Sequence, residues 1–225
     1  MGYISDNVTE FLDSFYTPLD EDLEELRREN EENNVPLILR ETEGFLSWLL
    51  DMTHPSRILE IGTAYGYSAV FFAKKLKDAE ITTIERSPYM IEAAEKTFAS
   101  REEGKQIEMK TGDAIEILDE LVDAVDKGDI EKYDFAFIDA GKSHYREFFD
   151  RAEHLLKPGS VVVCDNILMH GWTVSRSYTG SKRHRTNVKY MRQFLDYIEG
   201  RDDLSVSLLA SGDGLAVIRL NDKED

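Results

Sequence analysis

Arg57-Ile-Leu-Glu-Ile-Gly-Thr-Ala-Tyr-Gly-Tyr-Ser68 is the stretch that decides the fold of this chain of 225 residues. Its first part, mostly aliphatic, predicts a short buried strand, and Gly62 and Gly66 let the chain turn tightly into a helix that begins near Tyr67. Glycines admit a ligand close to the backbone, and the first turn of a helix offers unpaired N–H groups. The stretch therefore predicts a ligand-binding turn between a strand and a helix.

An acidic residue at the end of the next predicted strand indicates what kind of ligand this is. Glu85 follows Gly62 by 23 positions, and an acid about 20 residues beyond a glycine turn is placed to accept hydrogen bonds from ribose hydroxyls. The run from Gly62 to Gly66 lacks the close pair of glycines that packs against the pyrophosphate of a dinucleotide. Together with Thr111-Gly-Asp-Ala114, these residues favour a nucleoside-type cofactor over glycines that only shape a turn.

Predicted strands and helices alternate along most of the chain. Three helices come first, at about 6–15, 20–33 and 41–52, and the second is so acidic that we expect it to lie mostly on the surface. The predicted strands cover residues 57–61, 81–84, 106–110, 133–138, 160–164, 204–209 and 214–220. The helices between them cover residues 67–77, 88–99, 113–125, 144–156 and 185–199. Such alternation implies a mostly parallel sheet covered on both faces, with the last two strands paired as an antiparallel hairpin.

The composition is that of one globular domain. With 41% hydrophobic residues, the chain is long enough to bury a complete three-layer core. No apolar run approaches membrane-spanning length, the polar N-terminus does not resemble a signal sequence, and the single Cys164 precludes an internal disulfide. We therefore expect a cytoplasmic protein that does not contact membranes. The net charge of −18 argues, over the whole molecule, against a polyanionic partner.

Oxygen ligands are expected where the fourth and fifth strands end. Asp139 follows one of these strands directly, and Asp165-Asn166 follows the other. In a doubly wound sheet both strand ends open onto the crevice that holds Gly62 and Glu85. Two carboxylates and one amide oxygen are hard ligands that leave about three octahedral positions open, which suits Mg²⁺. The alternative is that Asp139 caps the following turn and Asp165-Asn166 is only a polar loop.

A lysine near this site is a candidate base. Lys142 lies three residues after Asp139, and beside a divalent cation the pKa of its ammonium would fall. The neutral amine is then able to take a proton from a substrate hydroxyl. His144 competes for the same role, and Trp172 and Tyr178 are candidates for stacking on a planar substrate.

One window of the chain is basic although the whole chain is acidic. No Asp or Glu occurs in residues 167–195, where the cations include Arg176, Lys182, Arg183 and Arg185. A solvated helix face paired with acids elsewhere explains most such runs. The alternative is a basic flap that grips phosphates beside the reaction centre, because the window begins directly after the predicted metal ligands.

Together the motifs resemble the cation-dependent O-methyltransferase family that includes the catechol and caffeoyl-CoA methyltransferases. The likeness covers about residues 36–220 and rests on Ile58-Leu-Glu-Ile-Gly-Thr-Ala-Tyr-Gly-Tyr-Ser-Ala69, Ile138-Asp-Ala-Gly-Lys142 and Asp165-Asn166. It implies an α/β, Rossmann-like class I methyltransferase fold with a seven-stranded, mostly parallel sheet and an antiparallel C-terminal hairpin strand. A single domain over residues 1–225 would consist of an N-terminal helical cap, 1–53, and the core, 54–225, and would form a homodimer.

The resemblance also implies roles for individual residues. The S-adenosylmethionine site would be formed by Ile38, Glu60, Gly62, Ser68, Glu85, Asp113, Ala114 and Asp139. Within it, Glu85 would hold the ribose, Asp113-Ala114 the adenine end and Ile38 the methionine side. Mg²⁺ would be bound by Asp139, Asp165 and Asn166, and Lys142 would be the catalytic base.

Within that family the chain most resembles the bacterial tRNA 5-hydroxyuridine methyltransferases. This implies methylation of the wobble 5-hydroxyuridine to 5-methoxyuridine, with the anticodon region of the tRNA held by Arg176, Lys182, Arg183 and Arg185. A small catechol- or caffeoyl-type phenol is the alternative substrate, because its adjacent oxygens and those of 5-hydroxyuracil can chelate a cation in the same way. A third possibility is a non-catalytic binding module, against which the intact Asp139, Lys142, Asp165 and Asn166 argue.

Overall fold

The computed structural model describes residues 6–175 and 180–221. Its centre is a seven-stranded sheet in the order β3-β2-β1-β4-β5-β7-β6. The five strands that run parallel are β1 (Arg57–Ile61), β2 (Glu80–Glu85), β3 (Ile107–Thr111), β4 (Tyr133–Ile138) and β5 (Leu156–Cys164). The antiparallel strands are β7 (Leu215–Leu220), which pairs with β5, and β6 (Leu204–Leu209) at the edge. The predicted fold class is therefore confirmed.

Two hydrophobic cores lie on opposite faces of this sheet, because side chains alternate between the faces along each strand. In β1, Leu59 and Ile61 belong to one core and Ile58 belongs to the other. The first core is covered by α6 (Ala114–Lys127), α7 (Tyr145–Leu155) and α8 (Lys182–Glu199). The second is covered by α2 (Glu21–Glu32), α3 (Arg40–Thr53) and α4 (Tyr67–Lys75), with Phe98 of α5 (Pro88–Ala99) packed against it.

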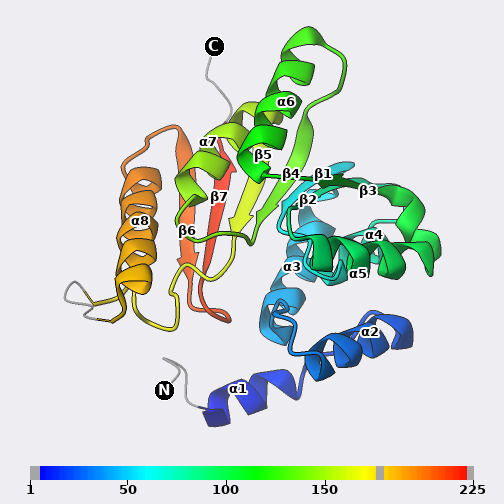
Figure 1. The fold of residues 1–225 in the computed structure, drawn as a ribbon. Coiled ribbons are helices and arrows are strands. Elements are labelled where there is room, and N and C mark those ends of the chain that lie inside the picture. The colour runs from blue at the N-terminus through cyan, green and yellow to red at the C-terminus, as the bar shows by residue number, and fades with distance from the viewer. Residues whose placement is uncertain (1–5, 176–179, 222–225) are drawn as a thin grey trace.

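Three helices precede the first strand, as the sequence predicts, and their division from the core as a cap stays a prediction. Figure 1 shows α1 (Asp6–Asp13) and α2 beneath the core, joined to it through α3. The acidic α2 is exposed on one side, as expected, but it buries Leu23, Leu26, Arg27 and Asn30 on the other. Within the described residues, no helix combines the length and the apolar character that crossing a membrane requires.

Two element boundaries differ from the prediction by three residues or more. β5 begins at Leu156, so Lys157-Pro-Gly159 lies inside a strand and not in a turn. This segment is tolerated because the β4–β5 pairing is irregular there and Gly159 has a φ of 81°. α8 begins at Lys182 and not near 185, because the Ser181 hydroxyl caps it by accepting a hydrogen bond from the His184 N–H.

Candidate active site

A cavity of about 500 Å³ opens at the carboxyl ends of the five parallel strands. It brings together residues from the cap, the glycine turn and these strand ends, as a doubly wound sheet is expected to do. The predicted cofactor residues that line it are Ile38, Gly62, Ser68, Glu85, Asp113, Ala114 and Asp139. Lys142 and Asn166 line the same cavity, whereas Glu60 and Asp165 do not. The sequence therefore located the cavity, and most of its predicted members share it.

The glycine turn is required by close packing between β1 and β4. Gly62 has a φ of 107°, and a Cβ atom there would lie 2.1 Å from the carbonyl oxygen of Asp139. Gly66, with a φ of 86°, begins α4, and its missing side chain leaves room for the ring of Phe98. Any larger residue at Gly62 would push apart the two strand ends that form the cavity floor.

Two acidic side chains at the cavity wall are held by backbone N–H groups. Glu85 accepts hydrogen bonds from Ala64 at 3.0 Å and from Arg86 and Ser87 at 2.9 Å each. Asp113 caps α6 by accepting from the Ile115 N–H at 3.0 Å. A carboxylate has about four lone-pair sites, so Glu85 keeps acceptor capacity for further donors in the cavity. Its fixed position suits the predicted ribose contact.

Glu60 lies behind the cavity wall and not on it. Its carboxylate is fully buried and accepts hydrogen bonds from the Ser68 hydroxyl and, at 2.5 Å, from the Thr83 hydroxyl. Along β1 it points to the face covered by α4, opposite to Leu59 and Ile61. Glu60 therefore does not line the cavity, but it accepts a hydrogen bond from Ser68, which does, and its place in the cofactor site stays a prediction.

The burial of Glu60 predicts that the stability of the fold depends on pH. Burial raises its pKa from the usual 4.5 to about 7, against the opposing hydrogen bonds from Ser68 and Thr83. The folded protein therefore holds this proton more tightly than the unfolded chain, and rising pH through this interval destabilises the fold. Glu60→Gln removes the effect, so relative to wild type the variant should gain about 3 kcal/mol between pH 4.5 and pH 8.

Urea unfolding of both proteins across this pH range measures the gain. Surface groups titrate alike in the two proteins, so their contribution cancels in the difference. A difference in unfolding free energy that stays constant with pH would show that the pKa of Glu60 is the same in the folded and the unfolded protein.

The predicted base bridges two of the predicted metal ligands. The Lys142 ammonium donates to Asp139 Oδ1 at 2.7 Å, to Asn166 Oδ1 at 2.5 Å and to the Tyr145 hydroxyl at 2.9 Å. Asn166 adopts a left-handed backbone with a φ of 57°, a conformation that costs energy for a non-glycine residue and aims its side chain at the lysine. Two oxygen atoms from neighbouring strand ends thus accept hydrogen bonds from one ammonium group.

The third predicted ligand, Asp165, is adjacent but buried. Its Oδ1 accepts from the Asn166 N–H at 2.6 Å, and the Tyr145 hydroxyl donates to its carbonyl oxygen at 2.7 Å. Burial, and next the charge of Asp139, raise the pKa of the Asp165 carboxyl. Within the described residues, no cluster of three His, Cys, Asp or Glu side chains is placed to hold a metal. The set whose chemistry fits a hard cation is Asp139, Asp165 and the amide of Asn166, which together are rich in oxygen. Two of them, Asp139 and Asn166, already bind one cationic group, the ammonium of Lys142.

The sequence also predicted a competing base, His144, and two aromatic residues that could stack on the substrate, Trp172 and Tyr178. His144 lines the cavity, but its Nδ1 is paired with Glu147 at 2.8 Å, so Lys142 is the group that contacts the oxygen ligands. Trp172 stacks on His184 of α8 with a centroid separation of 4.5 Å. Tyr178 falls outside the described residues.

The predicted basic contacts do not line the cavity where they are described. Lys182 and Arg185 are exposed at the start of α8. The backbone of Arg183 belongs to the same helix turn, and Arg176 lies outside the described residues.

Several cavity residues carry no recognisable signal in the sequence. Phe148 and Met90 line the cavity, and Tyr67 lies in its wall at the start of α4. Phe148 and His144 are four positions apart, and their rings lie 6.0 Å from each other across one turn of α7. Apolar residues at helical spacing usually belong to a core, so the sequence offers no reason to assign them to a ligand.

Comparison with known proteins places this geometry in context. The model of the family described as O-methyltransferase matches residues 13–221. The solved structure of a candidate caffeoyl-CoA O-methyltransferase from Staphylococcus aureus superposes with a TM-score of 0.87 at 31% identity, covering 96% of this chain and 100% of that one. The O-methyltransferase TomG from Streptomyces achromogenes, solved in complex with SAM, gives a TM-score of 0.81 at 27% identity, covering 96% of each chain.

Two curated relatives match over a shorter region. O-methyltransferase imqG of Aspergillus flavus is 32% identical over 145 residues, which are 64% of this chain and 57% of that protein. Catechol O-methyltransferase of Niastella koreensis is 34% identical over 136 residues, 60% of each protein. The match therefore spans less than two thirds of the length of these two relatives.

Proposed function

We propose a reaction for this chain, which belongs to the O-methyltransferase family: the methyl group of S-adenosylmethionine passes to one of two adjacent hydroxyls on a small phenolic substrate. The observation that carries the proposal is the convergence of Lys142, Asp139 and Asn166 at one end of the cavity whose other end holds Glu85. A base and a cation-binding oxygen set thus share one cavity with a ribose acceptor. The phenol oxygen attacks the methyl carbon, the carbon–sulfur bond breaks, and S-adenosylhomocysteine leaves.

Different residues of the cavity wall contact different parts of the cofactor in this proposal. Glu85 accepts the ribose hydroxyls, and Asp113 with Ala114 borders the adenine end at the start of α6. Ile38 and Ser68 border the methionine end, near Asp139. Structural relatives support this assignment, because TomG was solved with SAM and the O-methyltransferase from Bacillus cereus, 26% identical with a TM-score of 0.81, was solved with SAH.

The substrate end of the cavity supplies charge and a base. Asp139, Asp165 and Asn166 would hold Mg²⁺, which when bound lowers the pKa of the substrate hydroxyl. Lys142 takes the hydroxyl proton, and its contact with Tyr145 keeps the amine beside Asp139. The buried neighbours of this end, including Tyr145, limit the access of water that would compete for the proton.

A phenol is favoured over a nucleic acid by charge and by the relatives. The net charge of −18 repels polyanions, and one relative is a catechol O-methyltransferase. Methyl transfer to catechol, followed by mass spectrometry, tests the proposal, with phenol as the matched control that has a single hydroxyl. Catechol should react at least about 100-fold faster, because only adjacent oxygens fix the nucleophile. Equal rates, or no product, would exclude the proposed substrate class.

A second candidate is the wobble 5-hydroxyuridine of tRNA, favoured by the acid-free window from residue 167 to residue 195. Lys182 and Arg185 are exposed at the N-terminus of α8, where phosphates are attracted. In the same assay, tRNA methylation should fall more than about tenfold between 50 and 200 mM salt, whereas catechol methylation should change little. The double variant Lys182→Glu/Arg185→Glu should weaken only the tRNA reaction.

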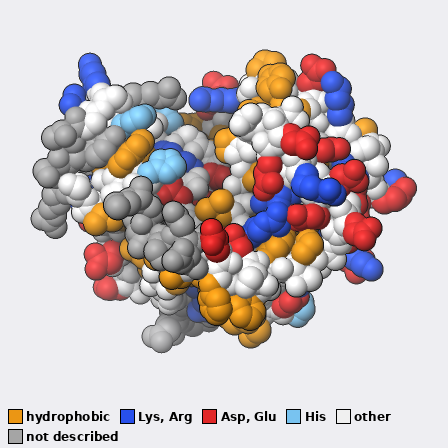
Figure 2. Space-filling view, turned by 90° about the horizontal axis from the view of Figure 1, so that it is seen from below, with side chains coloured by type: hydrophobic (Ala, Val, Ile, Leu, Met, Phe, Trp, Pro, Cys, Tyr) orange, Lys and Arg blue, Asp and Glu red, His pale blue; other side chains and the backbone are white. Residues whose placement is uncertain are grey.

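The cap also suggests a homodimer. Phe11 and Phe15 near α1 and Trp48 and Met52 on α3 are exposed by 61%, 70%, 58% and 65%. Figure 2 looks onto the side of the molecule where α1 and α2 lie, and hydrophobic groups are exposed there among charged ones. Exposed apolar groups of this size mark protein interfaces. Light scattering should give twice the monomer mass of 25.8 kDa, and Trp48→Glu should reduce it.

A further inference from the structure

Two charged side chains that the proposed reaction does not use are buried beneath the cavity wall. Arg27 of α2 and Glu43 of α3 are each only 2% exposed, and Arg27 Nη2 lies 2.6 Å from Glu43 Oε2. Removing two charges from water costs several kcal/mol per ion, and a buried pair is often no more stabilising than apolar residues of the same volume. A role beyond holding the fold together therefore has to be sought in what the pair contacts.

The remaining contacts of the pair lead to the cavity. Arg27 Nη1 donates to the carbonyl oxygen of Ile38 and Nε donates to the Tyr67 hydroxyl, each at 3.1 Å. The Tyr67 hydroxyl in turn donates to Glu43 Oε2 at 2.5 Å, and the Tyr16 hydroxyl donates to Oε1 at 2.5 Å. Both Ile38 and Tyr67 line the cavity. One guanidinium thus joins the segment before α3 to the first residue of α4.

The two residues that the pair holds belong to different parts of the cofactor wall. Ile38 comes from the cap, and Tyr67 directly follows Gly66 at the end of the glycine turn. The planar guanidinium offers donors in fixed directions, so it sets the distance between these two walls as well as joining them. Burial and the charge of Glu43 raise the pKa of Tyr67, which keeps its hydroxyl neutral and able to donate.

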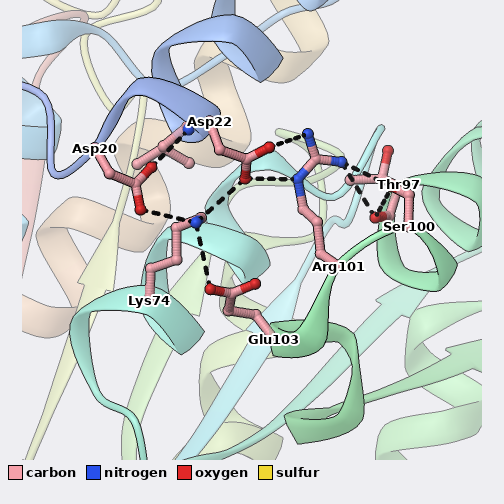
Figure 3. A network of polar contacts seen from close by, with 8 residues as sticks. Asp20, Asp22, Lys74, Thr97, Ser100, Arg101 and Glu103 are labelled. Carbon is pink, nitrogen blue, oxygen red and sulfur yellow. Dashed lines mark hydrogen bonds and ion pairs between the residues drawn. The ribbon is translucent and has the colours of Figure 1, made fainter.

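α2 is also attached to the core by contacts that do not involve this pair. A second network at the N-terminal end of α2 joins it to α4 and to Arg101, as Figure 3 shows. Lys74 lies 2.8 Å from Asp20, 3.2 Å from Asp22 and 3.3 Å from Glu103. Arg101 donates to both oxygens of Asp22, at 2.9 and 3.0 Å. None of these residues lines the cavity. The outer network therefore attaches α2 to the core, whereas the pair of Arg27 and Glu43 contacts residues of the cavity wall.

We propose that Arg27 and Glu43 are positioning residues for the cofactor: by fixing Ile38 and Tyr67 they set the affinity for the methionine end of S-adenosylmethionine without taking part in methyl transfer. The inference rests on the proposed function, because it takes the cavity to be the cofactor site. It assigns the cap a task inside the enzyme, namely to shape one wall of the binding site. Neither Arg27 nor Glu43 lines the cavity, so the transfer step itself should be unaffected once the cofactor is bound.

Calorimetric titration with S-adenosylhomocysteine tests this. The double variant Arg27→Met/Glu43→Leu replaces both charges by apolar residues of similar size and should fold with a melting temperature near that of wild type. Its Kd should rise about tenfold, as the loss of two hydrogen bonds to the wall implies. At saturating cofactor, kcat should stay within about threefold of wild type, so the change appears in KM for the cofactor.

Two further variants separate positioning from stability. Arg27→Lys keeps a charge pair and the fold but cannot bond Ile38, Tyr67 and Glu43 together, so it should also raise Kd. Asp22→Asn weakens the outer network of Figure 3 and should lower the melting temperature with Kd unchanged.

Three results would count against these expectations in different ways. Wild-type affinity in both Arg27 variants overturns the inference and leaves the proposed function standing. An equal rise of Kd in Asp22→Asn also overturns it, because any loosening of α2 would then suffice. No binding of S-adenosylhomocysteine by the wild type overturns the proposed function together with the inference.

Discussion

Removal of divalent cations with EDTA should lower methyl transfer to catechol by about 1000-fold, while S-adenosylhomocysteine still binds. The expected loss is large because charge stabilisation by a cation contributes several kcal/mol to such a reaction. Cofactor binding should persist because Glu85 and Asp113, which line the cavity, are not among the residues that would hold the cation. Initial rates before and after chelation, and after addition of Mg²⁺, measure the effect.

A variant tests the role of the cation without a chelator. Asp165→Ala removes one of the three residues that would hold Mg²⁺, so it should abolish Mg²⁺-dependent transfer. Because Asp165 is buried and does not line the cavity, cofactor affinity should be almost unchanged. Asp119→Ala is the matched control, because Asp119 is an exposed acid of α6 that is paired with Arg151 and does not line the cavity. Undiminished turnover in the presence of EDTA would rule out a cation in the mechanism.

Replacement of Lys142 should produce the second large effect. Lys142→Met should reduce kcat by about 100- to 10,000-fold, the usual contribution of a positioned base, with little change in KM for the cofactor. Lys142 contacts Asp139, Asn166 and Tyr145 and therefore lies at the substrate end of the cavity. The deficit should shrink as the pH rises toward the pKa of a phenol, near 10, because the substrate then ionises unaided.

Lys142→Arg distinguishes a base from a fixed positive charge. Arginine stays protonated at every pH of the assay, so it preserves the charge beside Asp139 but cannot accept a proton. We expect Lys142→Arg to be nearly as slow as Lys142→Met. Recovery of most of the wild-type rate in Lys142→Arg would show that Lys142 acts through its charge alone.

Much of the candidate site was predictable because it depends on local patterns. Gly62 and Gly66 are needed for a turn whose φ angles are positive, and such turns are visible in a sequence. Glu85 is the last residue of β2, Asp139 directly follows β4 and Asn166 lies two residues beyond β5, and parallel strands end at one edge of a sheet. These residues consequently meet in one cavity whatever the details of packing.

The contacts that the sequence did not predict share a different physical origin. Glu60 and Glu85 both stand on strands near the cavity, yet Glu60 is covered by Ser68 of α4 and Glu85 reaches the cavity wall. Nothing in the spacing of the two acids distinguishes them, because the difference depends on where a helix packs. Likewise Arg27 lies in α2. The acidic sequence of this helix predicted that it lies on the surface, but it did not predict that Arg27 is buried on its other side.

The sequence by itself determined the order of elements, the glycine turn, the parallel sheet with its C-terminal hairpin and the strand-end residues of the cavity, because each follows from patterns within a few neighbouring residues. Only the tertiary structure decided that Glu60 is buried, that Lys142 bridges Asp139 and Asn166, and that Arg27 meets Glu43 and Tyr67. These contacts join residues from separate helices and strands, so they depend on how the elements pack and not on the sequence around any one of them.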